Sequence, residues 1–267
     1  MLRVLSLGAG VQSTVMALMV ESGELPMVDC AIFADTGWEP KEVYEHLDWL
    51  ESKLSFPVHR VSIGNIKEDH LNGLNTTGQR FTSMPMYTES GGMGRRQCTL
   101  EYKINPIKKK IRTLLGVKKG ERVPKGTCIT QLIGISTDEA TRMRPARDKW
   151  IQNIWPLIDK GMSRSHCLSW FKERHPGRVL AKSACVGCPY HNDMMWRDMK
   201  MNDPASFKDA ALFDRLIRDK GSKFAKMKEQ QYLHRTRQPL DQVDFRNLED
   251  MGQLNMFENE CEGMCGN

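Results

Sequence analysis

The sequence lacks the marks of several large protein classes. No stretch approaches the roughly 18 apolar residues of a membrane-spanning helix, and the first residues carry no long apolar segment of an export signal. Internal repeats and low-complexity tracts are absent as well. We therefore expect a cytoplasmic protein that has no membrane partner.

The composition is that of an ordinary globular protein with a mild basic excess. Hydrophobic residues make up 40% and charged residues 27% of the 267 positions, which argues against a disordered or fibrous chain. The formal net charge is +6, and the densest basic run consists of Lys108, Lys109, Lys110 and Arg112. Such a run is either a solvated helix face or a contact for a polyanion, and the sequence leaves both open.

Strand-like and helix-like segments alternate along the first part of the chain. Apolar runs of strand length lie at residues 2–7, 28–34, 58–61, 131–135 and 150–155. Runs with helical spacing follow the first two of them, at residues 14–20 and 40–53. This order predicts an α/β fold, a doubly wound parallel sheet of the Rossmann-like type with its first strand central. A ligand site is expected beyond the carboxyl ends of the first and fourth strands.

Three regions are expected along the chain. Residues 1–160 would form a nucleotide-binding α/β domain, 161–240 a helical C-terminal extension with a pair of cysteines, and 241–267 a cysteine-containing tail. Residues 73–97 are rich in Gly, Ser, Thr and Met without clear periodicity, so we expect a long loop or lid there.

A glycine-containing loop joins the first predicted strand to the first predicted helix. It reads Ser6-Leu7-Gly8-Ala9-Gly10-Val11-Gln12-Ser13-Thr14. Glycines let the backbone pass close to a phosphate, and exposed amides at a helix start stabilise its charge. Ser13 and Thr14 add hydroxyl groups. The loop has neither the Gly-Lys-Ser/Thr ending of a Walker A loop nor the glycine spacing of a Rossmann fingerprint.

The loop resembles the PP-loop of ATP pyrophosphatases and of phosphoadenosine phosphosulfate (PAPS) reductases, whose usual form is Ser-Gly-Gly-x-Asp-Ser. The resemblance implies the PP-loop (HUP) version of the Rossmann-like fold and an adenine nucleotide, ATP or PAPS, as ligand. Aligned on Ser13, the chain has Gly8 for the family's serine, Ala9 for its first glycine and Gln12 for its aspartate. Gln12 therefore weakens any role of the loop in organising magnesium for pyrophosphate release.

Later segments resemble the same enzymes in the same order, and the resemblance covers most of residues 1–190. Phe33-Ala34-Asp35-Thr36-Gly37, with Glu39 and Tyr44 after it, resembles the segment beside the nucleotide. Gly134 to Glu139, followed by Arg142 and Arg144, resembles the segment that supplies acids and arginines near the phosphates, and Trp155-Pro156-Leu157 resembles the Pro-Leu segment beyond it. The resemblance assigns nucleotide binding to Ser6, Gly8, Ala9, Gly10, Gln12, Ser13, Thr14, Asp35, Thr36, Gly37, Ser136, Asp138 and Glu139. It assigns charge stabilisation to Ser13, Lys103, Arg142 and Arg144.

Eight cysteines without an export signal favour thiols or metal ligands over disulfides. Cys30, Cys128 and Cys167 stand in apolar or helical settings and are expected to be small core residues. Cys185-Val186-Gly187-Cys188 has the spacing of a metal-binding pair or of a redox dithiol.

Cys98 resembles the cysteine of cluster-containing adenylylsulfate reductases that faces such a pair, although that family has two adjacent cysteines there. Cys98, Cys185 and Cys188 therefore suggest a 4Fe-4S cluster with three protein ligands. A zinc site completed by His191 is the alternative, and a chain without metal is the third.

The tail Glu260-Cys261-Glu262-Gly263-Met264-Cys265 resembles the Glu-Cys-Gly-Leu-His ending that holds the catalytic cysteine of sulfonucleotide reductases, but without the histidine. Cys261 or Cys265 would then be catalytic, and the alternative is a pair of exposed thiols with no role.

Three functions are compatible with these patterns. The first is an ATP-dependent sulfurtransferase that adenylates its substrate, with a cluster, a sulfur donor and tRNA or DNA as acceptor. The second is a PAPS or adenylylsulfate reductase that uses a thiol donor. The third is a non-catalytic nucleotide-binding or nucleic-acid-binding module with a structural zinc. The oligomeric state stays open, and a homodimer is one of the options.

Overall fold

The computed structural model describes residues 1–73, 83–219 and 229–246, which form two compact units. Unit 1 consists of Met1–Ile63 and Tyr102–Ser183, and unit 2 of the described residues within Gly64–Glu101 and Ala184–Cys265. These units differ from the contiguous regions 1–160, 161–240 and 241–267 that the sequence suggested. The chain leaves unit 1 after its third strand and returns to it, which a reading of consecutive segments does not anticipate.

Unit 1 is built on a five-stranded sheet in which every neighbouring pair is parallel. Its strands are β1 (Arg3–Leu7), β2 (Cys30–Asp35), β3 (Val58–Ser62), β5 (Ile129–Ile133) and β6 (Ile151–Ile154). They are arranged in the order β3-β2-β1-β5-β6, so β1 is central. The predicted α/β class and central first strand are confirmed, and the order reverses between β1 and β5, where α/β proteins bind ligands.

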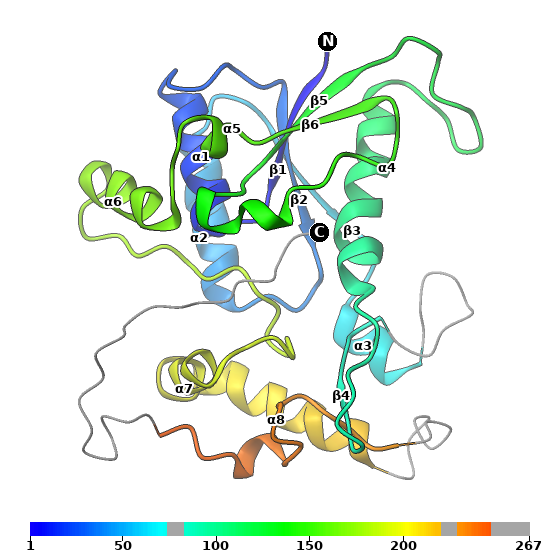
Figure 1. Cartoon of the computed structure of the whole chain (residues 1–267), viewed down its shortest axis with the longest axis vertical. Coiled ribbons are helices and arrows are strands. Elements are labelled where there is room, and N and C mark those ends of the chain that lie inside the picture. Colours follow the sequence, from blue (N-terminus) through cyan, green and yellow to red (C-terminus); the bar gives the residue numbers. More distant parts are fainter. Residues whose placement is uncertain (74–82, 220–228, 247–267) are drawn as a thin grey trace. The chain divides into compact units, whose positions relative to one another are not determined.

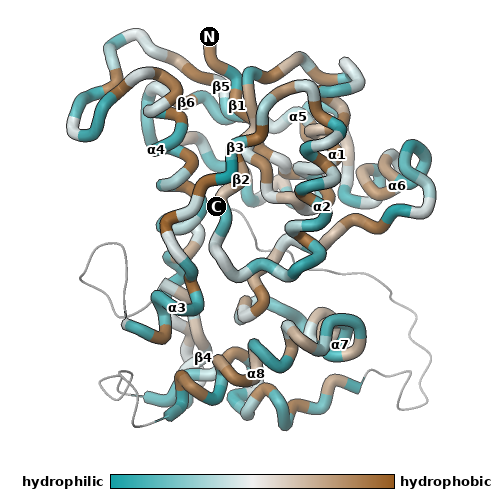
Figure 2. The backbone as a smooth tube through the Cα atoms, turned by 180° about the vertical axis from the view of Figure 1, so that it is seen from behind, coloured by the Kyte–Doolittle hydropathy of each residue, from teal (hydrophilic) through white to brown (hydrophobic). Residues whose placement is uncertain are grey.

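The two faces of this sheet follow from the alternation of side chains along its strands. Leu5 and Leu7 belong to the core that includes residues of α1 (Val11–Glu21), α2 (Lys41–Glu51), α5 (Pro156–Asp159) and α6 (Arg164–Arg174). Val4 belongs to the opposite core, which is covered by α4 (Asn105–Leu114). Figure 1 shows α1 and α2 on one side of the strands and α4 on the other. In Figure 2, α4 carries both hydrophilic and hydrophobic residues, as expected for a helix with one buried face.

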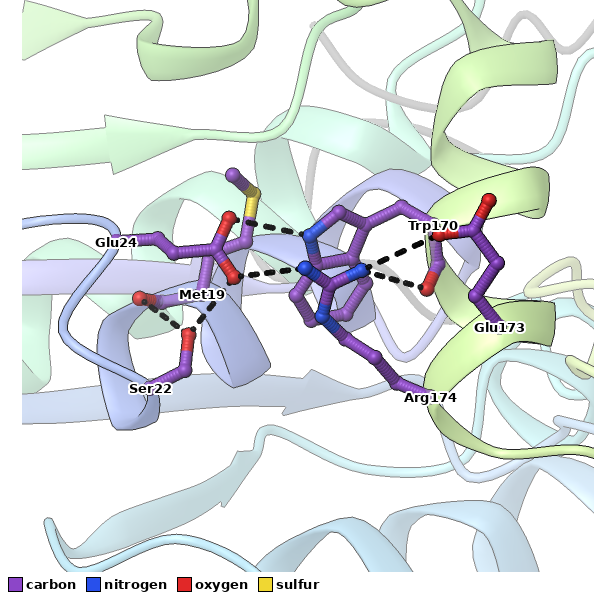
Figure 3. A network of polar contacts seen from close by, with 6 residues as sticks. All are labelled: Met19, Ser22, Glu24, Trp170, Glu173 and Arg174. Carbon is purple, nitrogen blue, oxygen red and sulfur yellow. Dashed lines mark hydrogen bonds and ion pairs between the residues drawn. The ribbon is translucent and has the colours of Figure 1, made fainter.

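A polar network holds α6 against the end of α1 (Figure 3). Glu24 accepts hydrogen bonds from Trp170 Nε1 at 3.2 Å and from Arg174 Nη2 at 3.4 Å. The guanidinium of Arg174 also lies 4.2 Å from the centre of the Trp170 ring. Cys167 and Phe171 of α6 are buried in the core of unit 1, so this helix, expected in the C-terminal extension, belongs to the same unit as the parallel sheet.

Unit 2 contains α3 (Ile66–Leu71), α7 (Asp193–Asn202), α8 (Pro204–Arg218) and a small antiparallel sheet of β4 (Tyr87–Thr88) and β7 (Gln231–Tyr232). Trp196, Phe207 and Phe213 are buried in it. Two-residue strands carry no periodic signal, so β4 was not expected within residues 73–97. Among the residues that the structure describes, no helix has both the length and the apolar character needed to cross a membrane.

Candidate functional site

The loop between β1 and α1 has a backbone shape suited to an anion. The amide of Gly8 donates to Ser13 Oγ at 3.1 Å, and this hydroxyl donates to the carbonyl of Gly10 at 3.3 Å. Ala9 has φ 54°, in the left-handed region that glycine usually occupies, and its side chain is buried. Gly10 is the N-cap of α1 and has no side chain to cap the first-turn amides. Those amides are therefore available for a phosphate or sulfate.

The segment after β5 packs directly against this loop. A Cβ atom on Gly134 would lie 3.0 Å from the backbone nitrogen of Ser13 and 3.2 Å from the carbonyl carbon of Gln12. A Cβ on Gly10 would lie 3.3 Å from Cβ of Ser183. Glycine at position 134 is therefore required by a close approach of two backbones, which brings together two segments that the sequence analysis assigned to one ligand.

Gln12 connects the loop to the segment after β5. Its Nε2 donates to Glu139 Oε2 at 3.1 Å and to Ser136 Oγ at 3.3 Å, while its Oε1 accepts from Arg164 Nη1 at 3.2 Å. A carboxylate at position 12 could not donate to Glu139, and its negative charge would repel that of Glu139. The amide of Gln12 thus fits an environment in which the segment after β5 already supplies an acid, Glu139.

The acidic residues of this segment are held by arginines. Arg142 Nη1 lies 2.5 Å from Glu139 Oε1. Burial raises the pKa of Glu139, and Arg142 partly offsets that effect. For Asp138, burial acts in the same direction, but hydrogen bonds from Ser136 and from the backbone amide of Arg164 outweigh it and lower the pKa. The site therefore contains two acids in different environments.

Arg144 is arranged differently from Arg142. Its Nη1 donates to the carbonyls of Thr141 at 2.9 Å and Met143 at 2.8 Å, and the residue is exposed. The structure brings Arg142, Asp138 and Glu139 to the loop, whereas the guanidinium group of Arg144 donates to carbonyls of its own chain segment.

The end of β2 supplies a second polar group in unit 1. Asp35 Oδ1 accepts from the amide of Gly37 at 2.8 Å and from the hydroxyl of Tyr44 at 2.9 Å. Burial raises the pKa of Tyr44, and the adjacent carboxylate of Asp35 adds to this effect. Tyr44 therefore stays a hydrogen-bond donor and fixes the orientation of Asp35.

Thr36 and Lys103 are connected through a buried glutamate. Thr36 Oγ1 donates to Glu39 Oε1 at 3.1 Å, and Lys103 Nζ lies 3.8 Å from the same oxygen. Lys103 is in the π-helical segment Thr99–Ile104, which leads into α4. Such π-helical segments often occur at functional sites. This one directs the ammonium group of Lys103 to the carboxylate of Glu39, which follows β2.

Thr14 and Ser6 have positions that differ from those of the other predicted ligands. Thr14 is fully buried, and its Oγ1 lies 2.9 Å from Nε2 of the buried His46. Burial, with a smaller contribution from Arg178, lowers the pKa of His46 to about 4, so this imidazole is neutral near pH 7. The pair anchors α1 to α2. Ser6 lies within β1, before the loop.

The three cysteines predicted to bind a cluster all belong to unit 2 and are half-buried. The amide of Cys188 donates to the carbonyl of Cys185 at 3.0 Å, in a tight turn. Burial raises the pKa of Tyr190, Arg96 opposes this, and Cys188 and Cys98 add to it, so both cysteines lie near this ring.

Across residues 1–73, 83–219 and 229–246, no group of three or more His, Cys, Asp or Glu residues has an arrangement that could hold a metal ion. Cys261 and Cys265 lie outside the described residues. Of the cysteines expected in the core, Cys30 and Cys167 are buried and Cys128 is half-buried.

Arg164 is the site residue that the sequence analysis missed. Ser163 is the N-cap of α6, so Arg164 is in the first turn of that helix, where a positive charge opposes the helix dipole. An arginine at this unfavourable position indicates that its side chain has a specific polar partner elsewhere in the fold. Its partners are Gln12 and Asp138, which lie far from it in the sequence.

Comparisons with known proteins identify the family of the chain. The family model described as the phosphoadenosine phosphosulfate reductase domain matches residues 3–142. No curated protein matches the chain. Among solved structures, the chain is similar to the phosphoadenylyl-sulfate (PAPS) reductase from Candida auris in a phosphate complex. The sequence identity is 15% over 64% of this chain and 72% of that chain, and the TM-score is 0.41.

Proposed function

Because the chain belongs to the phosphoadenosine phosphosulfate reductase domain family, we propose that it reduces a sulfonucleotide, PAPS or adenylylsulfate, bound at the loop between β1 and α1. The observation that carries this proposal is the amide of Gln12. An enzyme that releases pyrophosphate from ATP uses an acid in the loop to organise magnesium, whereas a reductase leaves the α-phosphate intact. Gln12 instead donates to Glu139, which supports the second chemistry.

The groups of the site divide the work of binding. The amides at the start of α1 and the hydroxyl of Ser13 would bind the phosphosulfate oxygens. Arg142 and Arg164 would balance the negative charge of these oxygens. The guanidinium of Arg142 is paired with Glu139, and that of Arg164 donates to Gln12 of the loop. Asp35, oriented by Tyr44, would accept from a hydroxyl or amino group of the nucleoside. A reduced, cytoplasmic setting suits such a reaction because it needs thiols.

The reaction balances with cysteine and an external dithiol. A thiolate, from Cys261 or Cys265 by resemblance to the family, attacks the sulfate sulfur, and the bond from sulfur to the phosphate oxygen breaks. The nucleotide leaves with the oxygen, and the sulfonate is now on the cysteine. A thiolate of the donor then attacks the cysteine sulfur, sulfite departs with the electron pair of the broken sulfur–sulfur bond, and a mixed disulfide forms between donor and cysteine. The second thiol of the donor attacks the donor sulfur of this mixed disulfide, which releases the cysteine thiolate and leaves the donor as a disulfide. Sulfur gains two electrons, and the dithiol supplies them.

Alanine at position 142 or 164 is expected to weaken sulfonucleotide binding about 10- to 100-fold, because a hydrogen bond to a charged group contributes about 1.5–3 kcal/mol. Arg144→Ala is the matched control and should change the affinity less than about 3-fold, because the Arg144 side chain is exposed and donates to the backbone carbonyls of Thr141 and Met143. Calorimetric titration with PAPS, adenylylsulfate and ATP measures these values. Equal losses in all three variants, or tighter binding of ATP than of either sulfonucleotide, would contradict the proposal.

A sulfurtransferase with a 4Fe-4S cluster and a tRNA or DNA acceptor is the second candidate. Cys98, Cys185 and Cys188 belong to the same unit, but among the described residues they do not form a group that could hold a metal ion. This candidate predicts about four irons and four sulfides per chain after anaerobic purification, lost in Cys185→Ala and kept in Cys128→Ala. It also predicts pyrophosphate release from ATP. A reductase that works with thiols alone predicts neither, and one zinc without iron would favour a binding module instead.

A further inference from the structure

A second charged region lies in unit 1, apart from the loop site. Residues 108–125 contain eight basic residues and one acidic residue, a net charge of +7 in a chain whose total is +6. The remainder of the chain is thus close to neutral. The positive charge of this protein is therefore a local property of the second half of α4 and of the connection from α4 to β5.

Part of this charge is used within the fold. Lys108 is paired with Asp148 at 2.6 Å. Arg112 Nη2 donates to the carbonyls of Glu121 at 2.5 Å and of Lys118 at 3.4 Å. These residues give the connection a defined shape, so the remaining cations are held on an ordered backbone.

Of the six remaining cations, Lys110 is half-buried and the other five point to solvent. Lys109, Lys118, Lys119, Arg122 and Lys125 are all exposed, and we call them the basic surface. The one acid among them, Glu121, accepts from the backbone amide of Lys118 at 2.8 Å. Its carboxylate thus stabilises the turn at residues 118–121. In Figure 1 this connection projects beyond the strands of unit 1.

The position of the basic surface separates it from the nucleotide site. The connection runs from the end of α4 into the first residue of β5, at the amino end of the parallel strands. The candidate site is at their carboxyl ends, after β1 and β5. A mononucleotide bound at the loop between β1 and α1 therefore does not need these lysines.

We propose that the basic surface binds the phosphate backbone of a nucleic-acid duplex without sequence preference. Long lysine and arginine side chains on a projecting segment match the dense, regular charge of a duplex, and binding would be driven by release of counterions. Residues 105–128 contain no aromatic side chain on which an unpaired base could stack, which favours a duplex over a single strand. This inference does not rest on the reductase chemistry.

Replacement of Lys118, Lys119 and Lys125 together by glutamine tests the proposal. Fluorescence anisotropy with a labelled 20-base-pair DNA duplex of mixed sequence, on the full chain without nucleotide, measures affinity between about 50 and 200 mM salt. We expect the triple variant to bind at least about 30-fold more weakly, with a salt slope lower by about 3.

Lys53, Lys172 and Lys208 are exposed lysines outside the basic surface, and their triple replacement by glutamine is the matched control. Its affinity for the duplex should stay within about 3-fold of the parent's, and its salt slope should be unchanged. The control loses the same total charge, but none of it from the basic surface. Circular dichroism and the unfolding midpoint check that both variants are folded. Equal losses in the two variants, no binding by the parent protein, tighter binding of a single strand, or full competition by poly-glutamate would each overturn the proposal.

Discussion

Gly134→Ala is expected to lower the free energy of unfolding by about 1–3 kcal/mol, and to weaken nucleotide binding at least about 10-fold. The new Cβ would lie 3.0 Å from the backbone nitrogen of Ser13, so the atom that must move belongs to the ligand loop. A flexible side chain could turn aside, but a backbone atom at a helix start cannot without displacing α1. Denaturation followed by circular dichroism, together with calorimetric titration, measures both effects.

Gly8→Ala is the control for stability. A Cβ there would lie 3.6 Å from Ser13 Oγ, an ordinary contact, so the free energy of unfolding should change by less than about 0.5 kcal/mol. If Gly134→Ala were as stable as Gly8→Ala, the close approach of the two backbones would not be as the structure describes it.

Gln12→Glu is expected to make stability fall more steeply with rising pH than it does in the parent protein, in which the pKa of Glu139 is already raised. The new carboxyl would face Glu139 Oε2, which now accepts from Gln12 Nε2 at 3.1 Å. Two facing carboxylates raise each other's pKa in the folded state, so the folded protein holds its protons more tightly than the unfolded chain. Stability should therefore fall as the pH rises through these pKa values. We expect near-parental stability at about pH 4 and a loss of about 1–3 kcal/mol at about pH 8.

The matched control is Gln12→Met, which has a similar length and no charge. It removes the hydrogen bonds to Ser136, Glu139 and Arg164, so its loss of stability should be about 1 kcal/mol and independent of pH. Urea denaturation of both variants across this pH range separates the two causes. A flat pH dependence in Gln12→Glu would mean that position 12 does not face Glu139.

The sequence alone predicted the elements whose signal is local. Apolar runs of strand length separated by amphipathic segments predicted the parallel sheet, because buried strands and half-buried helices have different periods. The central position of β1 was expected from the doubly wound architecture, in which the chain winds outward on both sides of the first strand. The loop Gly8-Ala9-Gly10 before Ser13 was identified because its conformation depends on residues that are adjacent in the chain. The boundaries moved by about two residues where pairing with a neighbouring strand sets the end, as for β5.

Tertiary structure alone decided which side chains meet. Arg164 reaches Gln12 across 152 positions, and Glu139 reaches it across 127, and no local pattern encodes such contacts. The division into two units had the same origin, since residues 64–101 join a later part of the chain. Hydrophobic periodicity indicates which side chains of one segment face the core and which face solvent. A site of charged groups is fixed instead by the packing of several segments, whose separation in sequence carries no information about their distance in space.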